Sequence, residues 1–357
     1  MRLILDLRHV NKDLFKFSVK YEGLEMLAQF VESKGFCIKF DLKSGYHHLG
    51  IFPPHQEYLG FSWRFGNSIK YYKFCVLPFG LSSACSIFTK LLRPLVKKWR
   101  GDGLKVILYL DDGICTNVCP DSLAIQANKM QKDLHALGFV VNEEKSSWNP
   151  SNHIVWLGFH LDLTAFEISV PDNKIDLLST KLEKTLESEF STARKLSSIV
   201  GTLISFEFAL GPIVQFMSRG LQLQVSEAPS WDSRLKISPN SCEEIKFWLE
   251  KPKKLPGKFL GVRSIELYDV YSDASAFAGG GYVVGFDQFA HRTWTNVEMQ
   301  CSSTFRELLA IQIVILQLSD LLKNRSFRMY TDNKNAEAIL KKGSTKPHLQ
   351  SLATKIS

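Results

Sequence analysis

The stretch KVILYLDDGI, residues 105–114, carries the strongest fold signal in the sequence. Apolar residues on both sides of Asp-Asp-Gly predict two short strands joined by a tight turn, with Asp111 and Asp112 at the tip of the hairpin. A third carboxylate, Asp41, ends the apolar segment GFCIKFDL, residues 35–42. If these strands are neighbours in one sheet, the three carboxylates meet at one edge. Taken alone, Asp-Asp-Gly is more often simple turn chemistry, so further motifs have to support a site.

Carboxylate oxygens clustered in this way are the ligands that Mg²⁺ prefers. Two metal ions held about 4 Å apart can activate a 3′-hydroxyl group and stabilise a leaving pyrophosphate. The cluster therefore predicts a site for two divalent ions, Mg²⁺ or Mn²⁺.

Length and composition bound the possible classes of protein. The 357 residues are enough for about two domains, and 45% hydrophobic with 22% charged residues is typical of globular protein. A net charge of +8 fits a polyanionic partner without requiring one. The seven cysteines are irregularly spaced, which favours reduced thiols over disulfides or a zinc site. No signal peptide or membrane-spanning apolar run is present, so we expect a soluble intracellular protein without a membrane partner, in cytoplasm or nucleus.

Further elements follow along the chain. Apolar spacing predicts a helix over 122–137 with Gly138 as its stop, a hairpin strand over 153–163, and helices over 173–220, broken at Gly211-Pro212. The segment EKPKKLPGKFLG, residues 250–261, has the prolines, glycines and lysines of an exposed linker.

A second set of carboxylates follows this linker. Asp273 lies in a predicted strand–turn–strand over 267–286, and Glu307 lies on a predicted helix over 302–322. Asp332 ends a predicted strand over 326–333, and a short helix is predicted over 335–343.

Several motifs, in this order, resemble those of reverse transcriptases: MRLILDLRHVNK, KFDLKSGYHHLGI, YKFCVLPFGLSSACSIFTKLL, ILYLDDG, LGFVVNEEK and VWLGF. Behind them, YSDAS, FRELLAI and YTDNKNA resemble the motifs of RNase H domains. The second pattern is most similar to DIRS-like retrotransposons, with gypsy-type elements and caulimovirus-like polymerases as the next candidates.

The resemblance implies roles for individual residues. Asp41, Asp111 and Asp112 would bind the polymerase metals, and the RNase H-like domain would bind two metals through Asp273, Glu307 and Asp332. The residues implied in nucleotide binding are Arg2 for the phosphates, the backbone carbonyl of Leu42, Tyr46 as the ring that excludes a 2′-hydroxyl, Phe79 and Gly80 at base and sugar, and Lys145 as a proton donor to pyrophosphate.

Other interpretations of these residues stay open. Tyr46 could be a core aromatic beside Tyr71, Tyr72 and Phe74, and Lys145 could be a solvated surface lysine. Two departures from the family stand out: Cys85 occupies a position where many relatives carry proline, and only forty residues precede Asp41, so we expect short fingers.

The helical region 173–220 resembles thumb and connection helices that grip a duplex by its backbone. Arg194, Lys195 and Arg219 are the candidate phosphate contacts, although each could equally lie on a solvated helix face.

The expected fold is α/β: a right-hand polymerase palm with partial fingers and thumb, then a truncated RNase H-like domain with a mixed sheet. The expected domains are 1–165 for fingers and palm, 166–249 for thumb and connection, 250–262 for a basic linker and 263–357 for the RNase H-like domain.

The expected activity is RNA- and DNA-templated DNA synthesis. The expected partners are an RNA template, a DNA primer, dNTPs, an RNA–DNA hybrid and other element-encoded proteins. Hybrid cleavage is expected to be impaired, because the fourth carboxylate of the family has no counterpart. The rival hypothesis is a decayed or domesticated fragment that binds nucleic acid without catalysis.

Overall fold

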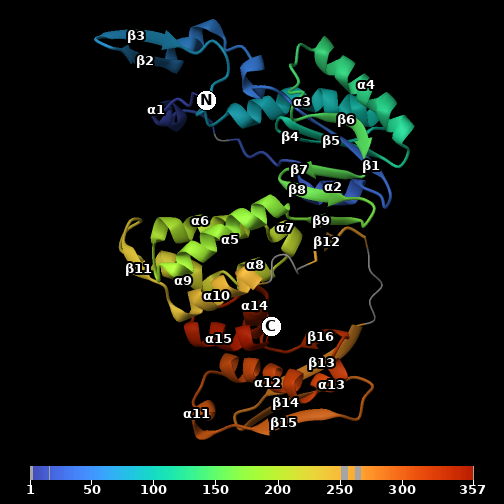
Figure 1. The fold of residues 1–357 in the computed structure, drawn as a ribbon, viewed down its shortest axis with the longest axis vertical. Helices are drawn as coiled ribbons and strands as arrows, with labels where there is room; N and C mark the ends of the chain where they lie inside the picture. The colour runs from blue at the N-terminus through green and yellow to red at the C-terminus, as the bar shows by residue number, and fades with distance from the viewer. Residues whose placement is uncertain (1–2, 16, 251–255, 262–266, 357) are drawn as a thin grey trace. The chain divides into compact units, whose positions relative to one another are not determined.

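The structure of the protein is a computed structural model that describes residues 3–15, 17–250, 256–261 and 267–356 (Figure 1). The chain divides into two compact units, Met1–Ile168 and Ser169–Ser357. Arg2 lies outside the described residues, as do residues 251–255 and 262 of the predicted linker.

The first unit is built on a four-stranded sheet with the order β4-β5-β1-β6, whose neighbouring strands β1 and β5 are antiparallel. The predicted hairpin is confirmed as β4 and β5, although Leu110 and Asp111 form its turn and Asp112 already belongs to β5. The elements of this unit are α1 (Arg8–Lys12), α2 (Leu24–Phe30), β1 (Phe36–Asp41), η1 (Gly45–His48), η2 (Pro53–Leu59), β2 (Gly60–Phe65), β3 (Ser68–Lys73), α3 (Ala84–Gly101), β4 (Lys105–Tyr109), β5 (Asp112–Asn117), α4 (Pro120–Ala136), β6 (Ser147–Ser151), β7 (His153–Trp156) and β8 (Phe159–Asp162), with β9 (Glu167–Ser169) at the boundary.

Helices α3 and α4 pack on this sheet around a core that contains Phe40, Phe88, Trp99 and Met130 (Figure 1). The buried residues of α4 are spaced by three and four positions, which turns one apolar face toward the sheet. Burying each such side chain contributes roughly 1.5–3 kcal/mol before entropy is counted. This core fixes the strand ends that carry the predicted carboxylates.

The segment before α1 passes close to Gly80. The amide of Leu5 donates to the carbonyl of Phe79 at 3.1 Å, and Gly80 has φ +105°. A Cβ atom at Gly80 would lie 2.2 Å from the carbonyl oxygen of Leu5. Glycine is therefore required here both by backbone conformation and by space.

The second unit begins with α5 (Asp172–Glu187), after which the structure corrects one expectation. A strand, β10 (Phe190–Thr192), interrupts the region predicted to be helical and pairs with β11 (Arg234–Lys236). This partner is distant in sequence, so local periodicity could not reveal it. The break at Gly211-Pro212 is confirmed, and the helices of this part are α6 (Ala193–Ile204), α7 (Glu207–Leu210), α8 (Ile213–Phe216), α9 (Arg219–Ser226) and α10 (Pro239–Glu250).

A buried carboxylate joins two of these helices. Glu244 of α10 accepts hydrogen bonds from the amides of Gly220 at 2.6 Å and Leu221 at 2.9 Å, at the start of α9. These amides belong to the first turn of a helix, which leaves them without partners inside the helix. Burial raises the pKa of Glu244 to about 7.

The rest of the second unit contains a mixed sheet with the order β15-β14-β13-β16, in which β13 and β16 are parallel. Helix α12 contacts β13, β14 and β15, and the helix predicted over 302–322 is divided at Leu318. The elements are β12 (Lys258–Phe259), β13 (Leu267–Ala274), β14 (Ala278–Val283), β15 (Phe289–Thr293), α11 (Asn296–Met299), α12 (Ser303–Gln317), α13 (Ser319–Leu322), β16 (Ser326–Tyr330), α14 (Lys334–Lys342) and α15 (Pro347–Ile356). In the described part of the chain, we find no helix with the length and apolar character needed to span a membrane.

Candidate active sites

Two of the predicted palm carboxylates face each other across the central strands. Asp41 is the last residue of β1 and Asp112 the first of β5, and the two are direct partners in the antiparallel register. The two carboxyl groups also interact, because Asp41 is among the groups that raise the pKa of Asp112. The prediction that strand ends bring these carboxylates to one edge is confirmed for this pair.

Asp111 lies in the turn between β4 and β5, next to this pair. Leu110 adopts φ +55°, a left-handed conformation that closes the tight turn. The carbonyl of Asp111 accepts a hydrogen bond from the amide of Leu42 at 2.9 Å, which ties the turn to the end of β1. A Cβ atom at Gly45 would lie 3.4 Å from that of Asp111, so η1 packs against the turn.

The electrostatics of this edge favour a neutralising partner. The pKa of Asp112 is raised to about 6, first by burial and then by the charges of Asp111 and Asp41. Neighbouring carboxylates repel one another unless a proton or a cation lies between them. Carboxylates are the ligands that a divalent cation prefers, although the donor atoms of Asp41, Asp111 and Asp112 do not all lie within 4.8 Å of one another in this structure.

Lys145 lies at the same edge, which is the position that its predicted role as a proton donor to pyrophosphate requires. Its Nζ lies 3.4 Å from Oδ1 of Asp41, and its side chain is 59% exposed. The next residue, Ser146, was not predicted as part of the site: its hydroxyl accepts from the amide of Asp41 at 3.1 Å and donates to the carbonyl of Asn142. No sequence motif marks this serine, because its partner lies far away in the chain.

The ring of Tyr46 lies between two other rings beside the turn. It is 5.0 Å from that of Phe79 and 5.4 Å from that of Phe88, and its hydroxyl is 2.8 Å from Sγ of Cys85. Burial and the Cys85 contact raise the pKa of Tyr46. The rings beside Tyr46 are thus Phe79 and Phe88, and Tyr46 also packs, partly buried, against the core that contains Phe88, as the core interpretation expects.

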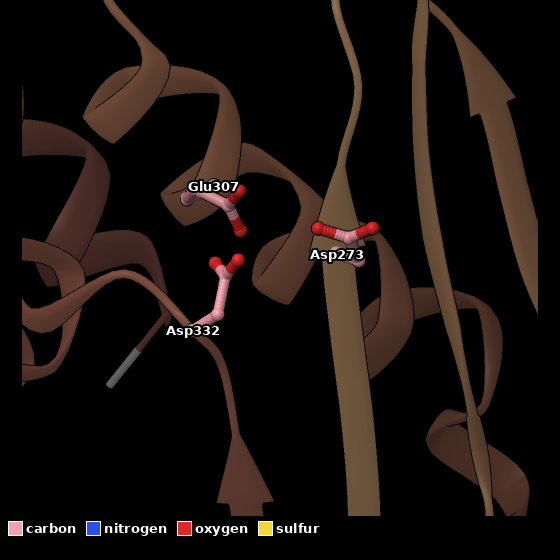
Figure 2. A group of neighbouring side chains, drawn as sticks. All are labelled: Asp273, Glu307 and Asp332. Carbon is pink, nitrogen blue, oxygen red and sulfur yellow. The ribbon is translucent and has the colours of Figure 1, made fainter.

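The second predicted set of carboxylates converges in the mixed sheet (Figure 2). Asp273 extends from β13, Glu307 from the first turns of α12 and Asp332 from the loop after β16. The register pairs Tyr271 with Tyr330, which brings the ends of the two parallel strands together. Among the described residues, these three form the one group of potential metal ligands whose donor atoms all lie within 4.8 Å of one another.

Glu307 is the buried member of this group. Burial, followed by the charges of Asp273 and Asp332, raises its pKa. The hydroxyl of Thr331 donates to Glu307 at 3.4 Å and was not predicted as part of the site.

Close packing of α12 on the sheet needs a glycine, because a Cβ atom at Gly279 would lie 2.4 Å from the ring of Trp294 and 3.0 Å from Ala310.

The three predicted phosphate contacts of the thumb region have different surroundings. Arg194 makes two hydrogen bonds with Asp232, at 2.9 and 3.0 Å. Lys195 lies at the start of α6, where its amide donates to Thr192. Arg219 is half-buried and donates to Gln222 at 3.2 Å. Arg194 and Arg219 thus have side-chain partners within the protein, and Lys195 is exposed.

A sheet with facing carboxylates at the ends of its central strands, followed by a mixed sheet with a carboxylate triad, defines the class: a polymerase palm combined with an RNase H-like domain. Comparison with protein families agrees. Residues 1–161 match the family "Reverse transcriptase (RNA-dependent DNA polymerase)", and residues 268–357 match the "RNase H-like domain found in reverse transcriptase". The chain thus carries a segment that matches the reverse transcriptase model, followed by a segment that matches the RNase H-like model.

Curated relatives are polyproteins of mobile elements and viruses. The chain is 28% identical over 346 residues to the retrovirus-related Pol polyprotein from transposon gypsy of Drosophila melanogaster, covering 93% of this chain and 32% of that protein. It is 22% identical over 349 residues to the enzymatic polyprotein of Figwort mosaic virus (strain DxS), covering 94% and 48%. The chain thus spans less than half the length of these relatives. They do not single out DIRS-like elements, so that finer assignment stays a prediction.

Solved structures share the fold. A foamy viral protease-reverse transcriptase in complex with double-stranded DNA matches with a TM-score of 0.58 at 19% identity, over 99% of this chain and 60% of that one. The foamy viral protease-reverse transcriptase in complex with an RNA/DNA hybrid matches with a TM-score of 0.59 at 17% identity, over 99% and 47%.

Proposed function

We propose that this chain synthesises DNA on RNA and DNA templates at the palm edge that carries Asp41, Asp111 and Asp112. The observation that carries the proposal is the placement of Asp41 opposite Asp112, with the amine of Lys145 3.4 Å from Asp41. The reverse transcriptase family match over residues 1–161 supports it.

The carboxylates of Asp41, Asp111 and Asp112, with the backbone carbonyl of Leu42, would hold Mg²⁺ or Mn²⁺. When bound, two such ions activate a 3′-hydroxyl group and stabilise the leaving pyrophosphate. Lys145 is placed to donate a proton to that pyrophosphate.

Sugar and base selection would fall to the residues beside this edge. The ring of Tyr46, supported by Phe88, would fill the space of a 2′-hydroxyl group and so favour deoxynucleotides. Phe79 lies against Tyr46, and Gly80 lets the backbone follow Leu5 closely there. Arg2 keeps its proposed role at the phosphates on the strength of the sequence alone.

The proposed partners are an RNA template, a DNA primer, dNTPs and other element-encoded proteins. Structural neighbours bound to double-stranded DNA and to an RNA/DNA hybrid support nucleic acid as the ligand. Lys195 and Arg219 remain candidate phosphate contacts, and Arg194 would have to exchange Asp232 for a phosphate. We also propose the domain limits 1–165, 166–249, 250–262 and 263–357.

Cleavage of RNA in a hybrid is the second candidate activity. The convergence of Asp273, Glu307 and Asp332 within 4.8 Å favours it, because two divalent ions need several carboxylate oxygens held together. Cleavage by this chain is tested by incubating it with a labelled RNA–DNA hybrid in the presence of Mg²⁺ and of Mn²⁺.

The polymerase proposal is tested by primer extension with dNTPs and Mg²⁺ on RNA and DNA templates. We expect extension by the wild-type chain and none above background by Asp111→Asn, while Asp121→Asn, an exposed aspartate on α4, keeps full activity. Full activity of Asp111→Asn would overturn the assignment. Tight nucleic acid binding by a wild-type chain that extends no primer would instead support the rival hypothesis of a non-catalytic fragment.

A further inference from the structure

The hairpin of β2 and β3 presents large side chains to solvent. Within Gly60–Phe65 and Ser68–Lys73, every residue except Phe61 is exposed. Trp63 and Phe65 are each 52% exposed and Tyr71 is 81% exposed. In Figure 1 the hairpin extends away from the sheet that contains β1 and β5. A two-stranded ribbon gains little stability from such rings, so their exposure calls for a ligand.

The register sorts these side chains onto two faces. Phe61 pairs with Tyr72, Trp63 with Lys70 and Phe65 with Ser68. Because side chains alternate along a strand, one face carries Phe61, Trp63, Phe65, Lys70 and Tyr72, which we call the aromatic face. The rings of Phe61 and Tyr72 are stacked at 5.5 Å, and the amine of Lys70 lies 5.6 Å from the centroid of Phe65.

The opposite face has a different composition. It carries Ser62, Arg64, Ile69, Tyr71 and Lys73. Its exposed ring, Tyr71, therefore provides a matched comparison for the rings of the aromatic face.

A series of ring contacts links the aromatic face to the palm. Phe61 lies 5.7 Å from Phe74, which lies 6.2 Å from His47. His47 lies 5.5 Å from Phe79, the ring next to Tyr46. A connected series of rings thus runs from the aromatic face to the residues proposed to bind the nucleotide.

The charge of the hairpin specifies the kind of ligand. Residues 60–74 contain Arg64, Lys70 and Lys73 and no acidic residue. Exposed rings combined with cations are the means by which proteins bind single-stranded nucleic acid, because rings stack on unpaired bases and cations attract phosphates. A duplex hides the faces of its bases and could use only the charges.

We propose that the aromatic face binds unpaired single-stranded nucleic acid, with bases stacked on Trp63, Phe65 and Tyr72. That the strand is the template ahead of the palm rests on the proposed polymerase function. The binding itself needs no catalysis.

The test measures equilibrium binding of the full chain to a fluorescently labelled single-stranded oligonucleotide by anisotropy, without dNTPs and in EDTA. We expect Trp63→Ala with Phe65→Ala to weaken binding by about 25-fold or more, since each stacked ring contributes a factor of at least about five. Ile69→Ala with Tyr71→Ala on the opposite face should change affinity by less than about twofold. Trp63→Phe should keep most of the affinity, and a blunt duplex should bind all variants alike.

Each other outcome overturns the inference. Unchanged affinity in the aromatic-face variant, with folding verified by circular dichroism, would mean that no strand stacks there. Equal losses in both double variants would mean that binding does not depend on the rings of the aromatic face in particular. If the wild-type chain is a dimer by sedimentation and the aromatic-face variant is a monomer with unchanged oligonucleotide affinity, the aromatic face binds a second copy of the chain instead.

The two proposals fail separately. Single-strand binding through this face by a chain that extends no primer would refute only the polymerase function. If the wild-type chain extends primers but Trp63→Ala with Phe65→Ala leaves the single-strand affinity unchanged, only the proposed stacking on the aromatic face is refuted.

Discussion

Asp41 and Asp112 are direct partners across the antiparallel strands β1 and β5, and the charge of Asp41 helps to raise the pKa of Asp112. One comes from the end of a strand and the other from the start of a strand, so both carboxylates reach the same edge of the sheet. The backbone holds them there, because the amide of Asp41 is bonded to Ser146 and that of Leu42 to the carbonyl of Asp111. A bound cation would therefore meet ligands whose positions are already fixed.

Tyr46→Ala should admit ribonucleotides. Only the bulk of this ring, held between Phe79 and Phe88, is proposed to exclude the 2′-hydroxyl group. We expect the ratio of kcat/KM for dNTP over rNTP to fall by at least about tenfold, the scale of one steric contact in a pocket. Tyr46→Phe, which loses only the hydroxyl beside Cys85, should keep the ratio. If an active Tyr46→Ala enzyme kept the same ratio of kcat/KM for dNTP over rNTP, the role of the ring would be purely structural.

Lys145→Ala should slow nucleotide incorporation without unfolding the protein. The side chain is 59% exposed and its contact with Asp41 is 3.4 Å long, so its loss should change stability by about 1 kcal/mol or less. Loss of a general acid should lower the rate of the chemical step by about a hundredfold. Single-turnover extension measures that step, and Lys43→Ala removes another exposed lysine of this region as the control. Equal rates in both variants would identify Lys145 as a solvated surface lysine.

Glu307→Gln should separate the two proposed activities. It removes one ligand of the Asp273 and Asp332 group, so hybrid cleavage should fall to background while primer extension continues. Because burial and like charges raise the pKa of Glu307, the neutral side chain should not lower the melting temperature in EDTA. Stabilisation of this domain by Mn²⁺ should also shrink, and Asp287→Asn, an exposed aspartate, should leave both properties unchanged. Hybrid cleavage at the wild-type rate by Glu307→Gln would exclude this triad as the nuclease site.

Glu244 should make stability depend on pH. Its pKa is about 7 in the folded protein against an ordinary value of 4.5, so the folded state holds the proton more tightly than the unfolded state. Its contribution is therefore fully present below about pH 4.5 and is lost as the pH rises toward 7, by up to about 3 kcal/mol.

Urea unfolding of wild type and Glu244→Gln across this range measures that contribution. The variant should unfold more easily at low pH, by about 1–3 kcal/mol, because one amide at the start of α9 loses its acceptor. Its disadvantage should shrink as the pH rises, whereas Glu243→Gln, an exposed neighbour, should follow the wild type. A constant difference between wild type and Glu244→Gln would show that Glu244 does not take up a proton on folding.

Local patterns in the sequence were sufficient for much of the fold. The apolar run before Asp41 and the two runs around Asp111 and Asp112 predicted the strands that carry the palm carboxylates. Apolar residues at helical spacing predicted α4, and the resemblance to RNase H domains predicted that Asp273, Glu307 and Asp332 converge. The strands and the helix were predictable because they depend on side-chain periodicity and on turn residues close together in the chain.

Only the tertiary structure decided the surroundings of these residues. Lys145 meets Asp41, Tyr46 meets Phe88 and Arg194 meets Asp232 through contacts between segments far apart in sequence. Strand β10 forms within a helical region because β11 supplies its hydrogen-bond partner. The sequence alone therefore determined the elements and their carboxylates, because periodicity is local. Packing between distant segments determined the charge, burial and hydrogen bonds on which the chemistry of those carboxylates depends.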